Sequence, residues 1–132
     1  MNVRITWRLL IPVAALLAVV GSVAQSGDHR IYSNVYYNEE GGDLLGTELE
    51  LTVHGHDVNG SLRIYQGGCA VPGAVRGTLV HGKLQLTGES TPYVGGKFEV
   101  TGTILPGVLV LERGVQPEAV RLKRVGKAHC QS

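Results

Sequence analysis

The sequence has few aromatic residues and almost no excess of charge of either sign. Its 132 residues include one Trp, one Phe and one Met, and the formal net charge is +1. Removal of Arg4 and Arg8 with an N-terminal leader would change this charge to −1. Because a basic excess is missing, we expect neither a nucleic-acid partner nor a general attraction to anionic membranes.

Motifs that mark common catalytic sites are also missing. The sequence contains no Gly-x-Ser-x-Gly nucleophile motif and no Gly-rich phosphate loop ahead of a helix. Ser61 and Ser90 have no specified His and Asp partners. Glu39 and Glu40 are adjacent, so in a strand they would point to opposite sides and would not form an acid–base pair. The sequence therefore predicts a protein that is not an enzyme.

A long apolar run occurs near the N-terminus. It spans residues 9–20, follows two arginines, and precedes the small residues Ser22-Val23-Ala24. This is the pattern of a secretory signal peptide, and the Pro-interrupted run is short for a membrane span. The alternative is a retained membrane anchor. We predict a signal peptide over residues 1–24, one domain over 25–132, a periplasmic or secreted location, and no stable membrane insertion after cleavage.

Cysteine is scarce, and both cysteines lie well beyond the predicted leader. In an exported chain, the even pair of Cys69 and Cys130 predicts a disulfide bond. Closing a loop of roughly 60 residues would stabilise the fold by about 4 kcal/mol in the chain-entropy model. Two free thiols are the alternative that a cytosolic protein would favour.

Glycine is abundant, and much of it recurs in a repeated phrase. The segment Val75-Arg-Gly-Thr-Leu-Val-His-Gly-Lys-Leu-Gln-Leu86 returns as Val100-Thr-Gly-Thr-Ile-Leu-Pro-Gly-Val-Leu-Val-Leu111, and a partial copy opens at Val58-Asn-Gly-Ser-Leu62. Each full copy predicts a strand, a two-residue turn at His81-Gly82 or Pro106-Gly107, and a second strand with one apolar face. The recurrent glycine would let a strand bend or a facing Leu pack closely.

The remaining strands follow from the same alternation of apolar and polar residues. We predict a first strand over Ile31 to Tyr37, one over Glu48 to Val53, and a last one over Glu118 to Val125. A turn at Gly55-His56 is preferred to one at Asn59-Gly60, because it pairs apolar residues with apolar residues throughout.

These elements predict an all-β protein. We expect a small antiparallel up-and-down meander barrel of about eight strands, with a two-sheet β-sandwich as the alternative. In such a meander, Cys69 and Cys130 begin at opposite ends of the barrel. Either the C-terminal tail runs back along the barrel, or the strand count is wrong by one.

One strand is similar to a known type. The stretch Gly82-Lys-Leu-Gln-Leu-Thr-Gly88 resembles an avidin-type strand, and the chain resembles small exported meander barrels of the lipocalin and avidin kind. Its single Trp, Trp7, lies in the predicted signal peptide. The chain therefore lacks the Trp residues typical of biotin pockets and the Gly-x-Trp opening of lipocalins, and the resemblance transfers neither a function nor any site residue.

The histidines at predicted turns form one candidate site. The turns that carry His54, His56 and His81 fall at one end of the meander, and the tail with His129 is expected there too. A His-x-His pair can chelate zinc or copper when another His or a carboxylate joins it. The alternative is that these are exposed turn residues without a ligand.

A second candidate site lies at the opposite end, where longer segments are expected to gather. These are the acidic loop with Glu39, Glu40 and Asp43, the connection Gln66 to Gly73, and the loop that carries Tyr93. Long loops at a barrel mouth often carry binding residues. The alternative is that these loops are solvated and have no fixed role.

The first strand adds three tyrosines, Tyr32, Tyr36 and Tyr37. They would either make a contact surface or cover part of the sheet.

Together these patterns favour binding over catalysis. We predict an exported, non-enzymatic binding module that engages a small ligand or an envelope protein, in an inhibitor-like manner, through the loops at one end of the barrel. A metal-binding envelope protein that uses the histidines is the alternative, and a purely structural envelope component is a third interpretation.

Overall fold

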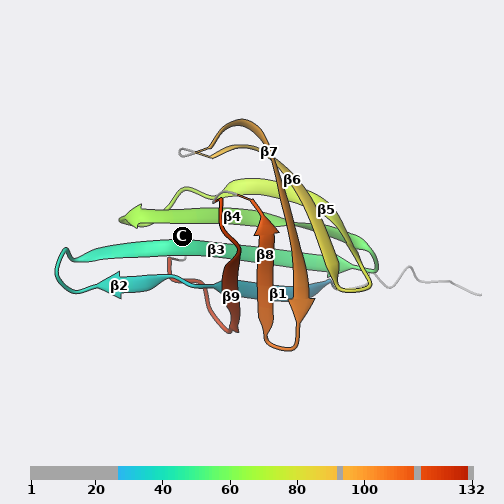
Figure 1. The fold of residues 1–132 in the computed structure, drawn as a ribbon, viewed down its shortest axis with the longest axis horizontal. Coiled ribbons are helices and arrows are strands. Elements are labelled where there is room, and N and C mark those ends of the chain that lie inside the picture. Colours follow the sequence, from blue (N-terminus) through green and yellow to red (C-terminus); the bar gives the residue numbers. More distant parts are fainter. Residues whose placement is uncertain (1–26, 92–93, 115–116, 131–132) are drawn as a thin grey trace, which may run out of the picture.

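The fold consists entirely of β-strands in the residues that the structure describes. The structure is a computed structural model that describes residues 27–91, 94–114 and 117–130, where it contains nine strands and no helix (Figure 1). The predicted signal peptide and Tyr93 lie outside these residues. The strands are β1 (Asp28–Ser33), β2 (Tyr36–Asn38), β3 (Asp43–His54), β4 (Asp57–Gly67), β5 (Gly73–Val80), β6 (Lys83–Thr91), β7 (Val94–Leu105), β8 (Val108–Arg113) and β9 (Val120–Val125).

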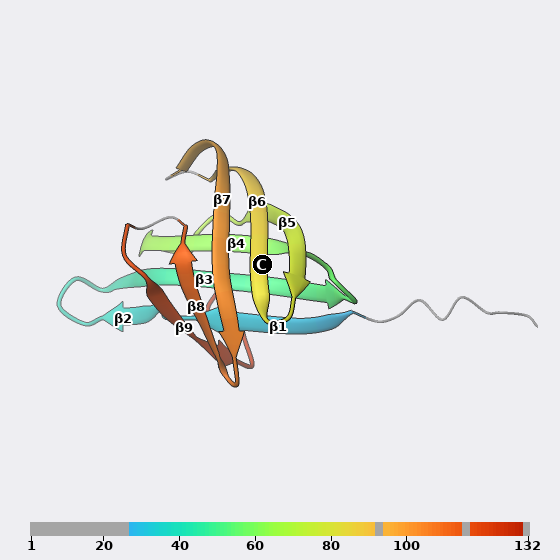
Figure 2. The ribbon, with the colours of Figure 1, turned by 45° about the vertical axis from the view of Figure 1, so that its right-hand side comes forward.

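The sheet closes on itself as an up-and-down barrel. From β3 to β9 each strand pairs with the next along the chain, β9 pairs with β1, and β1 pairs with β3. Every pairing is antiparallel, and β2 is an extra strand beside the start of β3. Figures 1 and 2 show the barrel from two directions, with the β2–β3 hairpin projecting beyond it. The predicted meander barrel is confirmed, in preference to the two-sheet sandwich.

The predicted hairpin registers are confirmed as well. His54 pairs with Asp57, so the preferred turn at Gly55-His56 is the one that forms. At His81-Gly82 both residues have positive φ, 50° and 74°, as a two-residue turn of the primed type requires. The inward pairs include Leu49 with Leu62, Val53 with Val58, Leu79 with Leu84, and Ile104 with Leu109.

The repeated glycine lies where a neighbouring strand passes closest. A Cβ atom at Gly60, Gly77 or Gly102 would collide with a backbone carbonyl oxygen of that strand. Each of these oxygens belongs to the residue that precedes the Leu opposite the glycine. A side chain cannot fit there, and the sheet uses these positions for the bending that a small closed barrel needs. The oxygens are those of Glu50, Gln85 and Val110.

The barrel interior is filled by aliphatic side chains and one tyrosine. Inward positions on all eight barrel strands supply this core, and most of its members are under 5% exposed. Burial of this much apolar area is the main force that stabilises the fold. The buried core consists of Tyr32, Leu49, Leu51, Val53, Val58, Leu62, Ile64, Val75, Leu84, Leu86, Val100, Leu109, Leu111 and Leu122, and Leu79, Phe98, Ile104 and Val120 pack against it.

The predicted first strand is broken in two. β1 ends at Ser33 and β2 begins at Tyr36, because Asn34 forms hydrogen bonds to Thr47 on β3 that replace the regular ladder. Its backbone N donates to the carbonyl oxygen of Thr47 at 3.1 Å, and its side-chain oxygen accepts from the Thr47 backbone N at 2.6 Å. Such side-chain bonds compete with strand pairing, so the chain leaves the barrel at this point. The last strand also starts later than predicted, at Val120.

The C-terminal tail runs back across the outside of the barrel. After β9 the chain passes over β1 and β3, and the backbone N of His129 lies 3.3 Å from the carboxylate of Glu48. Cys130 then forms the predicted disulfide with Cys69, with 5.8 Å between their Cα atoms. The eight-strand count was therefore correct, and the tail's path brings the two cysteines together. A disulfide fits an oxidising compartment.

Within the described residues, a search for helices able to cross a membrane finds none.

Candidate functional site

The two ends of the barrel are built differently. One end, here called the turn end, consists of the two-residue turns at Gly55-His56, His81-Gly82 and Pro106-Gly107. The other, here called the loop end, carries the β2–β3 hairpin and the connection from Gly68 to Pro72, with the tail fixed beside them. The acidic residues singled out in the sequence belong to the loop end.

The tip of the β2–β3 hairpin presents an acidic surface. Glu39, Glu40 and Asp43 are all exposed there. Asn38 fixes the turn, because its side-chain oxygen accepts from the Glu40 backbone N at 3.2 Å and its backbone oxygen accepts from Gly42 N at 2.8 Å. The three carboxylates are therefore carried on an ordered turn, where their negative charges add.

The tyrosines of the predicted first strand divide between two roles. Tyr32 is 1% exposed and belongs to the core, whereas Tyr36 and Tyr37 on β2 are 58% and 60% exposed. Because Tyr36 and Tyr37 are adjacent in a strand, they point to opposite sides of the hairpin. Each side of this projecting hairpin thus presents one exposed aromatic ring.

The connection between β4 and β5 lies next to this hairpin. Leu44 pairs with Gly67, so the end of β4 runs beside the start of β3. A Cβ atom on Gly67 would lie 3.9 Å from the Asp43 carboxylate. The connection also exposes Val71, with 64% of its surface accessible. The structure therefore brings the acidic loop and this connection together, as the sequence predicted, while Tyr93 lies outside the described residues.

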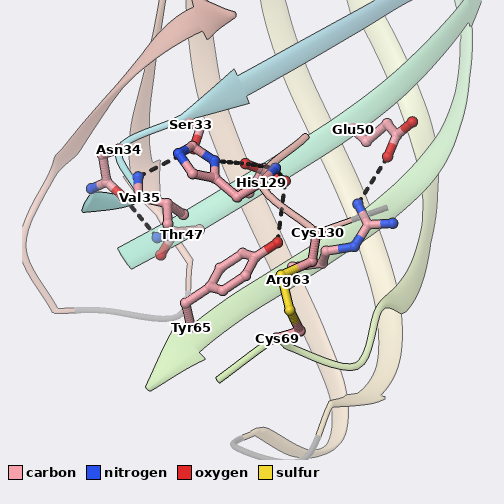
Figure 3. A network of polar contacts seen from close by, with 11 residues as sticks. Ser33, Asn34, Val35, Thr47, Glu50, Arg63, Tyr65, Cys69, His129 and Cys130 are labelled. Atoms are coloured by element: carbon pink, nitrogen blue, oxygen red, sulfur yellow. Dashed lines mark hydrogen bonds and ion pairs between the residues drawn. A yellow bond between two sulfur atoms is a disulfide. The ribbon is translucent and has the colours of Figure 1, made fainter. Parts of the chain in front are cut away.

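Beneath the tail lies a buried carboxylate that the sequence did not mark as a site. Glu48 is 0% exposed although it occupies an outward-facing position of β3. Its carboxylate lies 2.6 Å from Nδ1 of His129, accepts from the His129 backbone N, and accepts from the Tyr65 hydroxyl at 3.3 Å (Figure 3). These donors give the Glu48 carboxylate hydrogen bonds in place of those to water, which lowers the free-energy cost of burying it.

The surroundings of Tyr65, whose hydroxyl donates to Glu48, change the pKa of its phenol. Burial of the Tyr65 side chain, and then the negative charge of Glu48, raise the pKa of Tyr65 above its ordinary value of 10.0. Tyr65 therefore stays protonated and keeps donating to Glu48 at neutral pH.

The cluster contains a Ser, a His and a Glu, but it is not arranged as a catalytic triad. Ser33 Oγ lies 3.5 Å from Nδ1 of His129, which is the same nitrogen that contacts Glu48. A proton relay needs the nucleophile and the acid on different ring nitrogens. Ser33 Oγ instead accepts a hydrogen bond from the backbone N of Val35 at 3.1 Å. The contacts of Ser33 and His129 therefore differ from those of a Ser-His-acid relay.

Local sequence could not have found Glu48. Glu50, two residues along, has the same outward position and pairs with Arg63 and His29 at 2.8 Å on the surface. Only the path of the tail distinguishes the two glutamates. The one sequence signal was indirect, because the cysteine pair required a tail that crosses the barrel.

Of the four histidines predicted to share one end of the barrel, three lie at that end and one does not. His54, His56 and His81 are exposed at the turn end, and His56 is tied to the next hairpin by a contact of 3.2 Å from its Nδ1 to the Leu79 carbonyl. His129 does not join them: it lies at Glu48, six residues from His54 along β3, or about 20 Å. That part of the prediction was wrong, because the tail runs back along the barrel.

Among the described residues, no group of three or more His, Cys, Asp or Glu side chains is arranged to hold a metal ion. Zinc or copper binding by His54, His56 and His81 stays a prediction.

The outer face of β4 to β7 contains a groove of about 1000 Å³. Small residues such as Ala74 and Gly88 are part of its lining, and so are the oppositely charged side chains of Arg76, Lys97, Glu89 and Glu99. Its mixed charges select no particular ligand. The lining is Asn59, Gly60, Ala74, Val75, Arg76, Thr87, Gly88, Glu89, Lys97, Phe98 and Glu99.

Comparison with known proteins identifies no relative. A scan against protein-family models, a search of curated proteins and a search of solved structures all find no match. A function for this chain therefore has to be argued from the geometry of its own surfaces.

Proposed function

We propose that the protein is a non-enzymatic binding module of a periplasm or the extracellular space, and that it engages an envelope protein through the loop end of its barrel. One observation carries the proposal. Tyr36, Tyr37 and Val71 are each more than half exposed, beside an acidic tip, on segments that project beyond or border the barrel. Because Tyr36 and Tyr37 lie on opposite sides of the projecting hairpin, a partner that encloses the hairpin would contact both rings and the charges beside them.

The chemistry of these side chains suits a protein partner. Tyrosine is enriched at interfaces, because its ring gives a large contact area at a small cost in side-chain entropy. Glu39, Glu40 and Asp43 add three negative charges at the tip. These charges would steer a partner with a basic surface and accelerate its association at low salt.

The packing of the barrel favours a protein over a small ligand. In the described residues, aliphatic side chains from all eight barrel strands fill the core, which leaves less room for a ligand than the interior of a larger barrel. The closed barrel and the disulfide also hold the segments of the loop end in place. A rigid scaffold with an exposed aromatic hairpin is well suited to inhibitor-like docking.

Site-specific photo-cross-linking in cells that make the protein tests this proposal. Tyr37 is substituted by p-benzoylphenylalanine in one variant, and Leu105, which is 44% exposed at the turn end, is substituted in the matched control. We expect one dominant protein adduct at Tyr37 and none of it at Leu105. Equal adducts at both positions, or no protein adduct at Tyr37, would overturn the proposal.

The partner identified by cross-linking is then purified. Its affinity is measured for the parent barrel protein and for the triple variant E39Q/E40Q/D43N. We expect the variant to bind at least about tenfold more weakly and to lose most of the salt dependence, because the acidic tip supplies the steering charge. Unchanged affinity would show that the acidic tip is not part of the interface.

A further inference from the structure

The tail adds nothing to the backbone ladder that closes the barrel. In the described part of the chain, no strand pairing includes a residue beyond Val125, which pairs with Ile31 where β9 meets β1. Residues 126–130 contribute side-chain contacts, backbone hydrogen bonds from His129 to Glu48 and from Cys130 to Tyr65, and one disulfide. The barrel ladder is therefore complete without them.

The tail covers a strip of the outer surface. Ile31, Ser33, Glu48 and Tyr65 all occupy outward-facing positions of β1, β3 and β4, yet each is 5% exposed or less. Outward-facing neighbours that the tail does not reach, such as Glu50, are more exposed. The strip is buried because residues 126–130, here called the strap, lie over it.

The strap is held by few residues of its own. Of its five residues only Ala128 is fully buried, although the strap also covers Ile31 and Tyr65, and the His129 ring meets the Tyr65 ring edge to face. His129 bonds to Glu48, but that carboxylate would regain water if the strap lifted. Apart from the backbone itself, the disulfide is the one covalent link between the strap and the rest of the described fold. Cys69 is exposed, so a reductant can reach the bond.

We propose that the strap is a redox-controlled latch, which reduction of Cys69–Cys130 opens without unfolding the barrel. A dithiol reductant supplies two electrons and two protons: the sulfur–sulfur bond breaks, two thiols form, and the reductant becomes a disulfide. Opening exposes Glu48 and releases Cys69 in the connection that carries Val71. The latch thereby controls the loop end, and this part rests on the proposed function.

Hydrogen exchange measured by NMR, on the purified protein with and without dithiothreitol, tests the latch itself. The His129 amide donates directly to Glu48, so it reports whether the strap is closed. We expect reduction to bring its exchange close to that of an unprotected amide, at least about a hundredfold faster. Core amides such as those of Leu86 and Val100 should exchange faster as well, because the free energy of unfolding falls, but they should stay protected as a folded barrel requires. Complete loss of protection at the core amides, or an unchanged His129 amide, would overturn the proposal.

Two variants separate the strap from general destabilisation. H129A removes the side-chain contact to Glu48 and leaves the disulfide, whereas K127A alters an exposed strap residue and serves as the matched control. We expect H129A to make the disulfide reduce at a lower dithiothreitol concentration, by several-fold, and K127A to match the parent. Identical reduction of all three proteins would contradict a latch held by Glu48.

Cross-linking tests control of the loop end. With p-benzoylphenylalanine in place of Val71, we expect reduction to lower the yield of the partner adduct several-fold. If the strap opens but the yield is unchanged, control of binding is wrong. If the oxidised protein forms no adduct at Tyr37 or at Val71, the proposed function fails, and hydrogen exchange still decides whether the strap opens.

Discussion

The turn end and the loop end of this barrel show two ways of finishing a sheet. At the turn end, the chain reverses in two residues, and glycine together with strand pairing satisfies the local geometry. At the loop end, segments far apart in the sequence are held by a buried carboxylate and a disulfide. The locally determined end exposes Val80 and Leu105 at 40% and 44%, whereas the end assembled by long-range contacts carries the more exposed Tyr36 and Tyr37.

Removing the disulfide is expected to have the largest effect on the loop end. The variant C69S/C130S loses the cross-link between residues 61 apart, which should lower the free energy of unfolding by about 4 kcal/mol in the chain-entropy model. Urea denaturation followed by circular dichroism measures this loss, and the parent protein under dithiothreitol is the control. An unchanged midpoint would contradict the contribution assigned to the bond.

Substitution of a repeated glycine tests how far the hairpins depend on close strand pairing. G77V places a side chain against the Gln85 carbonyl and should destabilise the protein by about 3 kcal/mol or more. A Cβ atom added at Gly68 would meet nothing within 4 Å, so G68A is the matched control and should change stability by less than about 0.5 kcal/mol. Thermal denaturation of both variants measures the loss of stability. Equal destabilisation by G77V and G68A would contradict the close approach of the neighbouring strand at Gly77.

Two glutamates on one strand sharpen the comparison further. E48Q replaces a buried carboxylate that accepts from His129 and Tyr65, and it should cost about 2 kcal/mol. E50Q alters a partly exposed ion pair with Arg63 and should cost less than about 1 kcal/mol. Chemical denaturation at pH 7 ranks the two, and a larger loss for E50Q would contradict the buried role of Glu48.

The smallest expected effect concerns pH. The hydrogen bond from Arg63 lowers the pKa of Glu50 below its ordinary value of 4.5, so the native state favours the ionised carboxylate. Its stabilisation is complete above pH 4.5 and is lost as the pH falls through the lower folded value. E50Q should therefore show a flatter decline of stability between neutral pH and about pH 3 than the parent. Parallel curves would show that the pair contributes nothing measurable.

Much of the fold could be predicted because its information is local. Alternation fixed which face of each strand is buried, and His81-Gly82 and Pro106-Gly107 fixed the hairpin register. The acidic loop and the connection around Cys69 were also placed at the correct end, because strand direction alternates in a meander. The break between β1 and β2 was missed, because it depends on Asn34 meeting Thr47 across the sheet.

The sequence by itself determined the all-β class, the registers of the hairpins and the pairing of the only two cysteines, because each follows from short-range periodicity or from composition. Only the tertiary structure decided where the tail runs, and with it the fate of Glu48 and His129. Glu48 and Glu50 are equivalent in the strand pattern, yet one is buried and the other forms a surface ion pair. Burial at an outward position depends on what crosses above it, and strand periodicity contains no information about that.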